Sequence, residues 1–145
     1  MARQTVGMDT RAAADRFART WEDAWRRHDV DTVATLYAED CVHRSMPFRP
    51  VHAGRAAVVD YVRWAFSTED TTEVRFGRPI VDGDLALVEY WATSVEHDGE
   101  RPVTLAGCGL LRFDPDGLVV EARDYWHVAD GHRPPTGSLF FPSQP

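Results

Sequence analysis

The fold is decided by residues 85–128, which read LALVEYWATSVE-HDGE-RPVTLAGCGLLRF-DPDG-LVVEARDYWHV. Three long runs rich in aliphatic and aromatic residues alternate with two short segments, 97–100 and 114–117, of residues that favour tight turns. The pattern predicts long strands from Leu85 to Glu96, Pro102 to Phe113 and Leu118 to Val128, which hairpins join into an antiparallel sheet.

The residues nearer the N-terminus show helical spacing instead. From about residue 10 to His28, the predicted helix has an apolar face made of Ala14, Phe17, Ala18, Trp21, Ala24 and Trp25. Asp31 is the predicted N-cap of a second, short helix that ends near Asp40. A third helix is expected between Gly54 and Thr68.

Extended segments complete the order of elements. Residues 41–46 are expected to form a short strand or an extended connection, and the alternation around Val74 and Phe76 predicts a further strand. The sum is an α+β fold in residues 10–130, with three N-terminal helices packed on one face of a strongly curved antiparallel sheet. Such a cone-shaped arrangement would enclose a pocket.

The segment 131–145 is a Pro/Gly-rich C-terminal tail with Phe140 and Phe141 as its apolar anchor. One hypothesis is that the tail folds over the pocket mouth as a lid.

Composition excludes several classes of function. The chain has 145 residues and a net charge of −7, which disfavours binding to nucleic acid or to anionic lipid. It contains no Lys, so a Schiff base on a lysine side chain is excluded. No apolar run approaches the roughly 20 residues of a membrane span. Cys41 and Cys108 form no CxxC pair and indicate a cytoplasmic protein with reduced thiols.

Cofactor and metal motifs are also missing from the sequence. The six histidines show neither HxxxH nor HExxH spacing, and no Gly-rich dinucleotide fingerprint follows a predicted strand. We therefore expect no cofactor and no metal site.

Both faces of the strand from Leu85 to Glu96 are apolar, whereas a half-solvated antiparallel strand would have one polar face. Helices can cover one face, and a second copy of the chain is the simplest cover for the outer one. We therefore expect a homodimer, with contacts from Glu89, Trp91, Tyr125 and His127. The alternative is that these residues are simply exposed.

Three stretches of the sequence carry a family resemblance. They are WRRHDVD (25–31) running to LYAED (36–40), MP (46–47) leading to GRA (54–56), and GLVVEARDYW (117–126). On these residues the chain resembles the nuclear transport factor 2-like superfamily, and within it the SnoaL-like proteins, over about residues 10–130. That superfamily includes isomerases, dehydratases, polyketide cyclases, epoxide hydrolases and proteins that only bind, and many members are homodimers.

The limonene-epoxide-hydrolase-like branch permits a comparison by position. Its catalytic Asp on the last strand matches Asp124, whereas its Arg and Asp on the middle strand correspond to Tyr90 and Ala92. Its Tyr and Asn before Met-Pro correspond to His43 and Ser45. Two members of the Asp-Arg-Asp arrangement are therefore absent, which argues against epoxide hydrolysis by that arrangement.

The resemblance implies a pocket for a small apolar molecule and assigns residues to it. Asp124 is the implied general acid or base, assisted by His43 and Tyr90. The implied ligand-binding residues are Trp25, Ser45, Val62, Phe66, Val88, Ala92, Leu105, Gly107 and Trp126. The reaction implied is a cofactor-free isomerisation, dehydration, cyclisation or hydrolysis.

Other interpretations of these residues stay open at this point. Asp124 could be a structural carboxylate that caps backbone donors or pairs with Arg123, and His43 could be a satisfied, half-buried histidine without a role in the pocket. Trp21 and Trp25 could belong to the core. The chain could then be a non-catalytic ligand-binding protein, or a dimerisation or interaction module.

Overall fold

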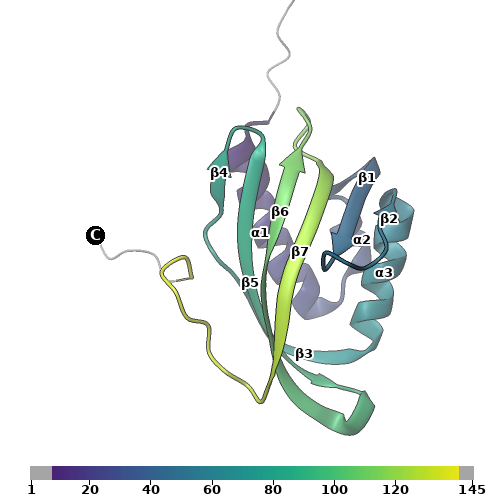
Figure 1. Cartoon of the computed structure of the whole chain (residues 1–145), viewed down its shortest axis with the longest axis vertical. Helices are drawn as coiled ribbons and strands as arrows, with labels where there is room; N and C mark the ends of the chain where they lie inside the picture. Colours follow the sequence, from purple (N-terminus) through teal and green to yellow (C-terminus); the bar gives the residue numbers. More distant parts are fainter. Residues whose placement is uncertain (1–7, 141–145) are drawn as a thin grey trace, which may run out of the picture.

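The computed structural model describes residues 8–140. This part of the chain contains the helices α1 (Thr10–Arg27), α2 (Val30–Ala34) and α3 (Arg55–Ser67), and the 3-10 turn η1 (Asp98–Glu100). Its strands are β1 (Tyr37–Ser45), β2 (His52–Ala53), β3 (Glu69–Phe76), β4 (Ile80–Asp82), β5 (Leu85–Glu96), β6 (Arg101–Phe113) and β7 (Val119–Asp130). The α+β class and the three helices are confirmed, and Figure 1 shows the helices on one face of the sheet.

Helix α1 follows the predicted pattern. Asp9 caps its N-terminus, since the Asp9 Oδ1 atom accepts a hydrogen bond of 2.7 Å from the Ala12 amide. Phe17, Ala18 and Ala24 on its apolar face are buried against the sheet. The helix ends where His28 adopts a left-handed conformation with φ of 54°.

The second helix is shorter than predicted and has a different cap. Asp29, rather than Asp31, accepts from the Thr32 amide and from the Thr32 hydroxyl. The helix ends at Ala34 instead of near Asp40, because the chain from Tyr37 pairs with another strand. Pairing in the sheet overrides the weak helical pattern of this segment.

The sheet is mixed, so the prediction of an antiparallel sheet was wrong for one pair of strands. Its order is β2-β1-β7-β6-β5-β3, with β4 also paired to β5, and β1 runs parallel to β7. The pattern within one strand does not specify its partner, and the parallel pair joins segments about 80 residues apart. This pair sets β1 beside the last strand, where the candidate site lies.

The sheet twists, but it is not strongly curled, which corrects the expected cone (Figure 1). Strong curl requires bulges at which the hydrogen-bond register shifts. The register of β5 with β6 is continuous from Leu85↔Arg112 to Glu96↔Arg101, so the central pair of long strands has no such bend.

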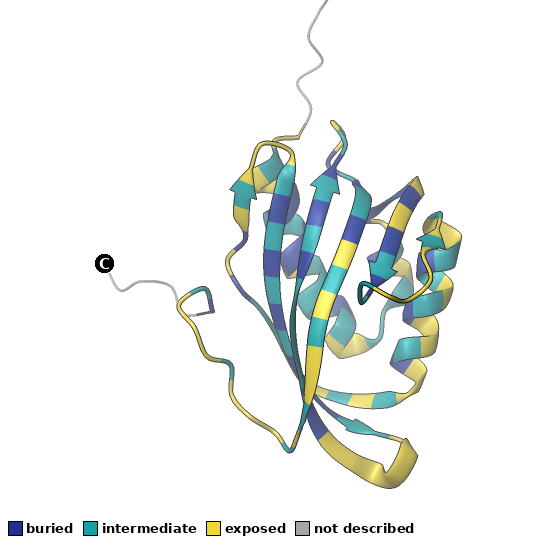
Figure 2. Cartoon of the chain, viewed as in Figure 1, coloured by how far each residue is buried: buried dark blue, intermediate teal, exposed yellow. Residues whose placement is uncertain are grey.

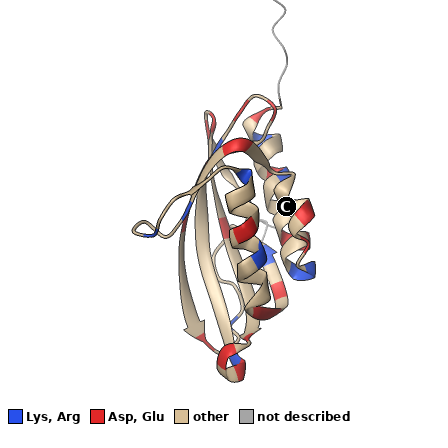
Figure 3. Cartoon of the chain, turned by 90° about the vertical axis from the view of Figure 1, so that its right-hand side faces the viewer, with Lys and Arg blue, Asp and Glu red and all other residues tan. Residues whose placement is uncertain are grey.

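The core lies between the helices and the inner face of the sheet. It includes Val33 and Val58 from the helices and Val88, Leu111 and Val119 from the strands, all nearly or fully buried. Along β7, exposed residues alternate with less exposed ones (Figure 2). Charged residues are concentrated on the helices and the strand ends in Figure 3. Within residues 8–140, no helix is both long enough and apolar enough to cross a membrane.

The C-terminal tail crosses the outer face of the sheet, which corrects the lid hypothesis. Phe140 is buried edge-on against Trp91, with ring centroids 6.1 Å apart. The Trp91 Nε1 atom donates to the Arg133 carbonyl at 2.8 Å. Trp91 faces away from the helices, so the described tail lies opposite the cavity, and Trp91 contacts the tail instead of a free dimer surface. Phe141 lies outside the described residues.

Candidate functional site

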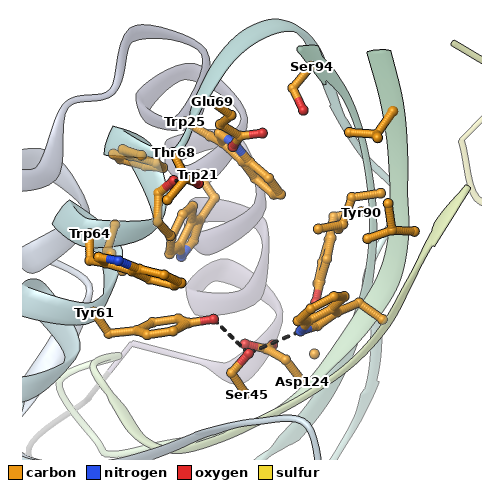
Figure 4. A pocket seen from close by; sticks show the side chains of 18 of the residues that line it. Trp21, Trp25, Ser45, Tyr61, Trp64, Thr68, Glu69, Tyr90, Ser94 and Asp124 are labelled. Atoms are coloured by element: carbon orange, nitrogen blue, oxygen red, sulfur yellow. Dashed lines mark hydrogen bonds between the residues drawn. The ribbon is translucent and has the colours of Figure 1, made fainter. Parts of the chain in front are cut away.

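A cavity of about 360 Å³ lies between α1, α3 and the inner face of the sheet. Aromatic side chains make most of its wall, and Figure 4 shows how they face one another. The aromatic lining residues are Phe17, Trp21, Trp25, Tyr37, Tyr61, Trp64, Phe66, Phe76, Tyr90 and Trp126. A cavity of this size and composition is typical of sites for small organic molecules.

The inner end of the cavity holds a carboxylate paired with a histidine. Asp124 projects from β7 and lines the cavity, with its side chain 25% exposed. The His43 Nε2 atom on β1 lies 2.8 Å from the Asp124 Oδ2 atom. His43 itself is buried behind Asp124. Arg123 instead contacts Glu121 at 3.8 Å, so the interpretation of Asp124 as the partner of Arg123 was wrong.

Ser45 joins the two walls of the cavity beside this pair. Its hydroxyl oxygen accepts a hydrogen bond of 2.8 Å from the Tyr61 hydroxyl of α3 and one of 3.0 Å from the Trp126 Nε1 atom of β7. Figure 4 shows Ser45, Tyr61 and Asp124 together at one end of the cavity. The two hydrogen bonds hold Tyr61 and Trp126 in fixed orientations next to Asp124.

Two buried phenols face the same carboxylate. Burial, and then the negative charge of Asp124, raise the pKa of Tyr90 well above its usual value. The same two causes raise the pKa of Tyr37, whose hydroxyl accepts from the Trp21 Nε1 atom at 3.2 Å. Both phenols therefore stay protonated at neutral pH and can donate hydrogen bonds.

The outer end of the cavity is acidic. The Glu69 Oε1 atom accepts from the Trp25 Nε1 atom at 3.0 Å, and Glu96 and Asp98 also line this region. Arg49 is the one basic residue among the described lining residues, and its guanidinium lies 5.0 Å from the centroid of the Trp126 ring.

The structure brings most of the predicted site residues together. Asp124, Tyr90, Trp25, Ser45, Val62, Phe66, Leu105 and Trp126 all line the cavity. Trp21 and Trp25 also pack against the core. Val88 and Ala92 point the expected way but are buried in the interior and do not line the cavity. Gly107 does not line it either.

The two glycines of β6 have different roles. A Cβ atom at Gly107 would lie 2.5 Å from the Tyr125 carbonyl oxygen and 2.6 Å from the Trp126 Cβ atom, so only glycine fits there. A Cβ atom at Gly109 would lie 3.0 Å from the Asp124 Oδ1 atom. Gly107 thus permits the close packing of β7, whereas Gly109 leaves space for the Asp124 carboxylate.

Several site residues carried no clear signal in the sequence. His52 on the short strand β2 contacts His43, and Gly109, Tyr61, Trp64 and Glu69 line the cavity. Tyr61 and Trp64 fall three apart on α3, which could have placed them on one face. Among the described residues, no cluster of three or more His, Cys, Asp or Glu side chains could hold a metal ion.

Solved structures with the same fold include proteins of different activities. A proposed isomerase from Bacillus subtilis has a TM-score of 0.71 at 20% identity, covering 83% of this chain and 90% of that chain. A protein with a ketosteroid isomerase-like fold from Catenulispora acidiphila, in complex with trimethylamine, has a TM-score of 0.66 at 17% identity, covering 75% and 83%.

An LEH-like epoxide hydrolase from M. tuberculosis has a TM-score of 0.64 at 25% identity, covering 79% of this chain and 83% of that chain. A search of curated proteins finds no significant sequence match. The sequence itself matches the SnoaL-like domain over residues 18–122, which is more than half of its length. The chain belongs to the SnoaL-like domain family, within the nuclear transport factor 2-like superfamily.

Proposed function

We propose that the chain is a cofactor-free acid–base enzyme that moves a proton on a small, largely apolar molecule, with Asp124 as the proton carrier. One observation carries the proposal. The Asp124 carboxylate is hydrogen-bonded to the buried His43 and faces an aromatic cavity, where it can contact a ligand with little water present.

The proposed reaction begins with proton abstraction next to a carbonyl group. The Asp124 carboxylate takes the proton from carbon as the C–H electron pair moves toward the carbonyl oxygen. Tyr90 donates a hydrogen bond to the enolate that develops, because its phenol stays protonated. Return of the proton from Asp124 to another carbon completes an isomerisation. Transfer of the proton to a departing β-hydroxyl group, which leaves as water, completes a dehydration.

The His43 contact supports this role for Asp124. When Asp124 is ionised, the His43 Nε2 atom donates to the Oδ2 atom and leaves the Oδ1 atom for the substrate. Epoxide hydrolysis is less well supported, since Tyr90 and Ala92 occupy the positions of the Arg and Asp in the limonene-epoxide-hydrolase-like branch.

The charge of the lining favours neutral or cationic substrates. Four carboxylates, those of Glu69, Glu96, Asp98 and Asp124, line the cavity together with the single guanidinium of Arg49. Anionic molecules would be repelled, whereas aromatic rings attract cations. The trimethylamine bound by the protein from Catenulispora acidiphila agrees with this expectation.

The experiment is a turnover screen with β,γ-unsaturated ketones, β-hydroxy ketones and epoxides, followed by Asp124→Asn on any substrate found. We expect kcat to fall by about 10²–10⁴-fold in the variant, while ligand affinity changes little. Unchanged turnover would remove the acid–base role. If ligands bind but none reacts, the chain is a non-catalytic ligand-binding protein.

We also propose that two copies associate through the outer face of β6 and β7. Ala106, Cys108 and Leu110 are half-buried on this face, and Tyr125 is 41% exposed. The tail already covers Trp91, so the proposed contact is confined to the side of β7. Light scattering on the wild type and on Tyr125→Glu tests it: a dimer that the variant splits supports the contact, and a monomeric wild type rejects it.

A further inference from the structure

A chain of three side chains leads from the cavity to the edge of the sheet. The Asp124 Oδ2 atom lies 2.8 Å from the His43 Nε2 atom, and the His43 Nδ1 atom lies 3.1 Å from the His52 Nδ1 atom. His43 is 4% exposed, whereas His52 is half-buried on β2, the edge strand. The chain therefore runs from the ligand cavity through a buried ring to the rim of the protein.

We propose that His52 is the outer end of a proton path that connects Asp124 with solvent through His43. The assignment rests on the proposed acid–base role of Asp124, because only a proton carrier needs such a path. His52 acts in it through His43 and does not touch the ligand.

The hydrogen-bond geometry fixes the direction of each donor. An ionised Asp124 can only accept, so the His43 Nε2 atom carries the proton and the His43 Nδ1 atom has a lone pair. Only one proton fits between the two Nδ1 atoms, so it belongs to His52. The His52 Nε2 atom then has a lone pair that can accept a proton from water.

Protonation from outside shifts one proton along each link. The His52 Nε2 atom takes a proton from water, which leaves as hydroxide. The His52 Nδ1 proton moves to the His43 Nδ1 atom, and the His43 Nε2 proton moves to the Asp124 Oδ2 atom. The result is a neutral carboxylic acid and two neutral imidazoles of the opposite tautomer. The reverse sequence starts from this second pair of tautomers, returns the Oδ2 proton of Asp124 to water and restores the first pair.

The surroundings of His52 suit a carrier that stays neutral. Burial, and then the neighbouring His43, lower the pKa of His52 below its usual value. From α3, Tyr61 stacks on the His52 ring with centroids 4.5 Å apart. The Tyr61 hydroxyl donates to Ser45, so it does not compete for the His52 nitrogens. The stacked ring holds His52 in line with His43.

The test measures the exchange of the His43 Nε2 proton with water by nitrogen-15 NMR at pH 7, without any substrate. His52→Phe keeps a ring on Tyr61 but removes both nitrogens. His52→Gln keeps a donor for the His43 Nδ1 atom but cannot pass a proton on. His127→Gln, at an exposed histidine of β7, is the matched control.

We expect the exchange to slow by about tenfold or more in both His52 variants, and to stay unchanged in the control. The His43 Nε2–H tautomer should persist in His52→Gln. Unchanged exchange in both variants would overturn the path. Slow exchange in His52→Phe alone would also overturn it, because His52 would then be only a hydrogen-bond donor.

The measurement separates this inference from the proposed function. A protein that shows the exchange path but no turnover would refute the enzyme while retaining the path. If Asp124→Asn abolishes turnover while the His43 Nε2 proton exchanges at the normal rate in His52→Gln, the proposed enzyme activity is supported and the proton path is refuted.

Discussion

Gly109 on β6 lies directly opposite Asp124 on β7, and a Cβ atom at position 109 would come within 3.0 Å of the Asp124 Oδ1 atom. The absence of a side chain at Gly109 is therefore a condition for the position of the carboxylate. We expect Gly109→Ala to displace Asp124 and to lower kcat by about 10- to 100-fold, since small misplacements of reacting groups are costly.

Cys108→Ala is the matched control for that change, because Cys108 is the neighbouring residue on the opposite face of β6. Steady-state kinetics on the substrate found in the turnover screen measures both variants. Equal activity of Gly109→Ala and the wild type would show that the carboxylate has room to move.

Gly107 should respond differently, although it lies only two residues away. Its substitution by Ala would place a Cβ atom against backbone and the Trp126 Cβ atom of β7, neither of which can rotate away. We expect Gly107→Ala to lower the free energy of unfolding by about 1–3 kcal/mol or more. Urea unfolding measures this change. A variant as stable as the wild type would mean that β7 shifts without cost.

The long strands could be predicted from the sequence pattern, whereas the side of the sheet on which Asp124 lies was implied only by the family resemblance. Alternating apolar residues and strong turn segments specify β5, β6 and β7 locally. The parallel partner of β7 could not be predicted, because pairing depends on long-range contacts. His52 was missed for a related reason, since a strand of two residues has no periodicity to detect.

The position of the C-terminal tail could not be predicted from the sequence either. A Pro/Gly-rich segment has no repeating pattern that tells which face of the sheet it covers, so the lid hypothesis had no local support. The decisive contact is tertiary, because the Trp91 indole nitrogen requires an acceptor and finds the Arg133 carbonyl.

Ser45 supports a prediction about stability. Ser45→Ala would leave the Tyr61 hydroxyl and the Trp126 indole nitrogen without their shared acceptor. We expect a loss of about 1–3 kcal/mol in the free energy of unfolding. Tyr61→Phe is the control that removes one donor only, and the double variant should be less destabilised than the sum of the two single ones.

The pH dependence of stability should report on His52. Because burial and His43 lower the pKa of His52 below about 6.5, the unfolded chain binds a proton there more readily than the folded chain. This contribution is present above pH 6.5 and is lost as the pH falls toward the pKa of the folded state. Between pH 7 and 5, the free energy of unfolding of His52→Gln should therefore fall less than that of the wild type.

Denaturant unfolding of both proteins across that pH range measures the difference. The hydrogen bond from His97 to Asp70 raises the pKa of His97, so the contribution of His97 to stability falls as the pH rises. This contribution is the same in the wild type and in His52→Gln and cancels in their difference. Parallel stability curves for the wild type and His52→Gln would contradict the prediction.

The position of the tail predicts a change in stability without a change in ligand binding. Phe140 is 5% exposed, so we expect Phe140→Ala to lower the free energy of unfolding. The loss should be about 3–5 kcal/mol, or somewhat less because residue 140 lies near the end of the described chain. Phe48→Ala, at a fully exposed phenylalanine, should cost almost nothing. Ligand affinity, followed by tryptophan fluorescence, should be the same in both variants, and a large loss in Phe140→Ala would place the tail in the binding site.

The parallel pairing of β1 with β7 affects the order in which the chain folds. His43 and Asp124 are 81 residues apart in the chain, and the strands that present them meet only after the segment between them has been ordered. Contacts of such high sequence separation form late and slow the folding reaction. During synthesis, His43 and Asp124 can therefore pair only after residue 124 has left the ribosome.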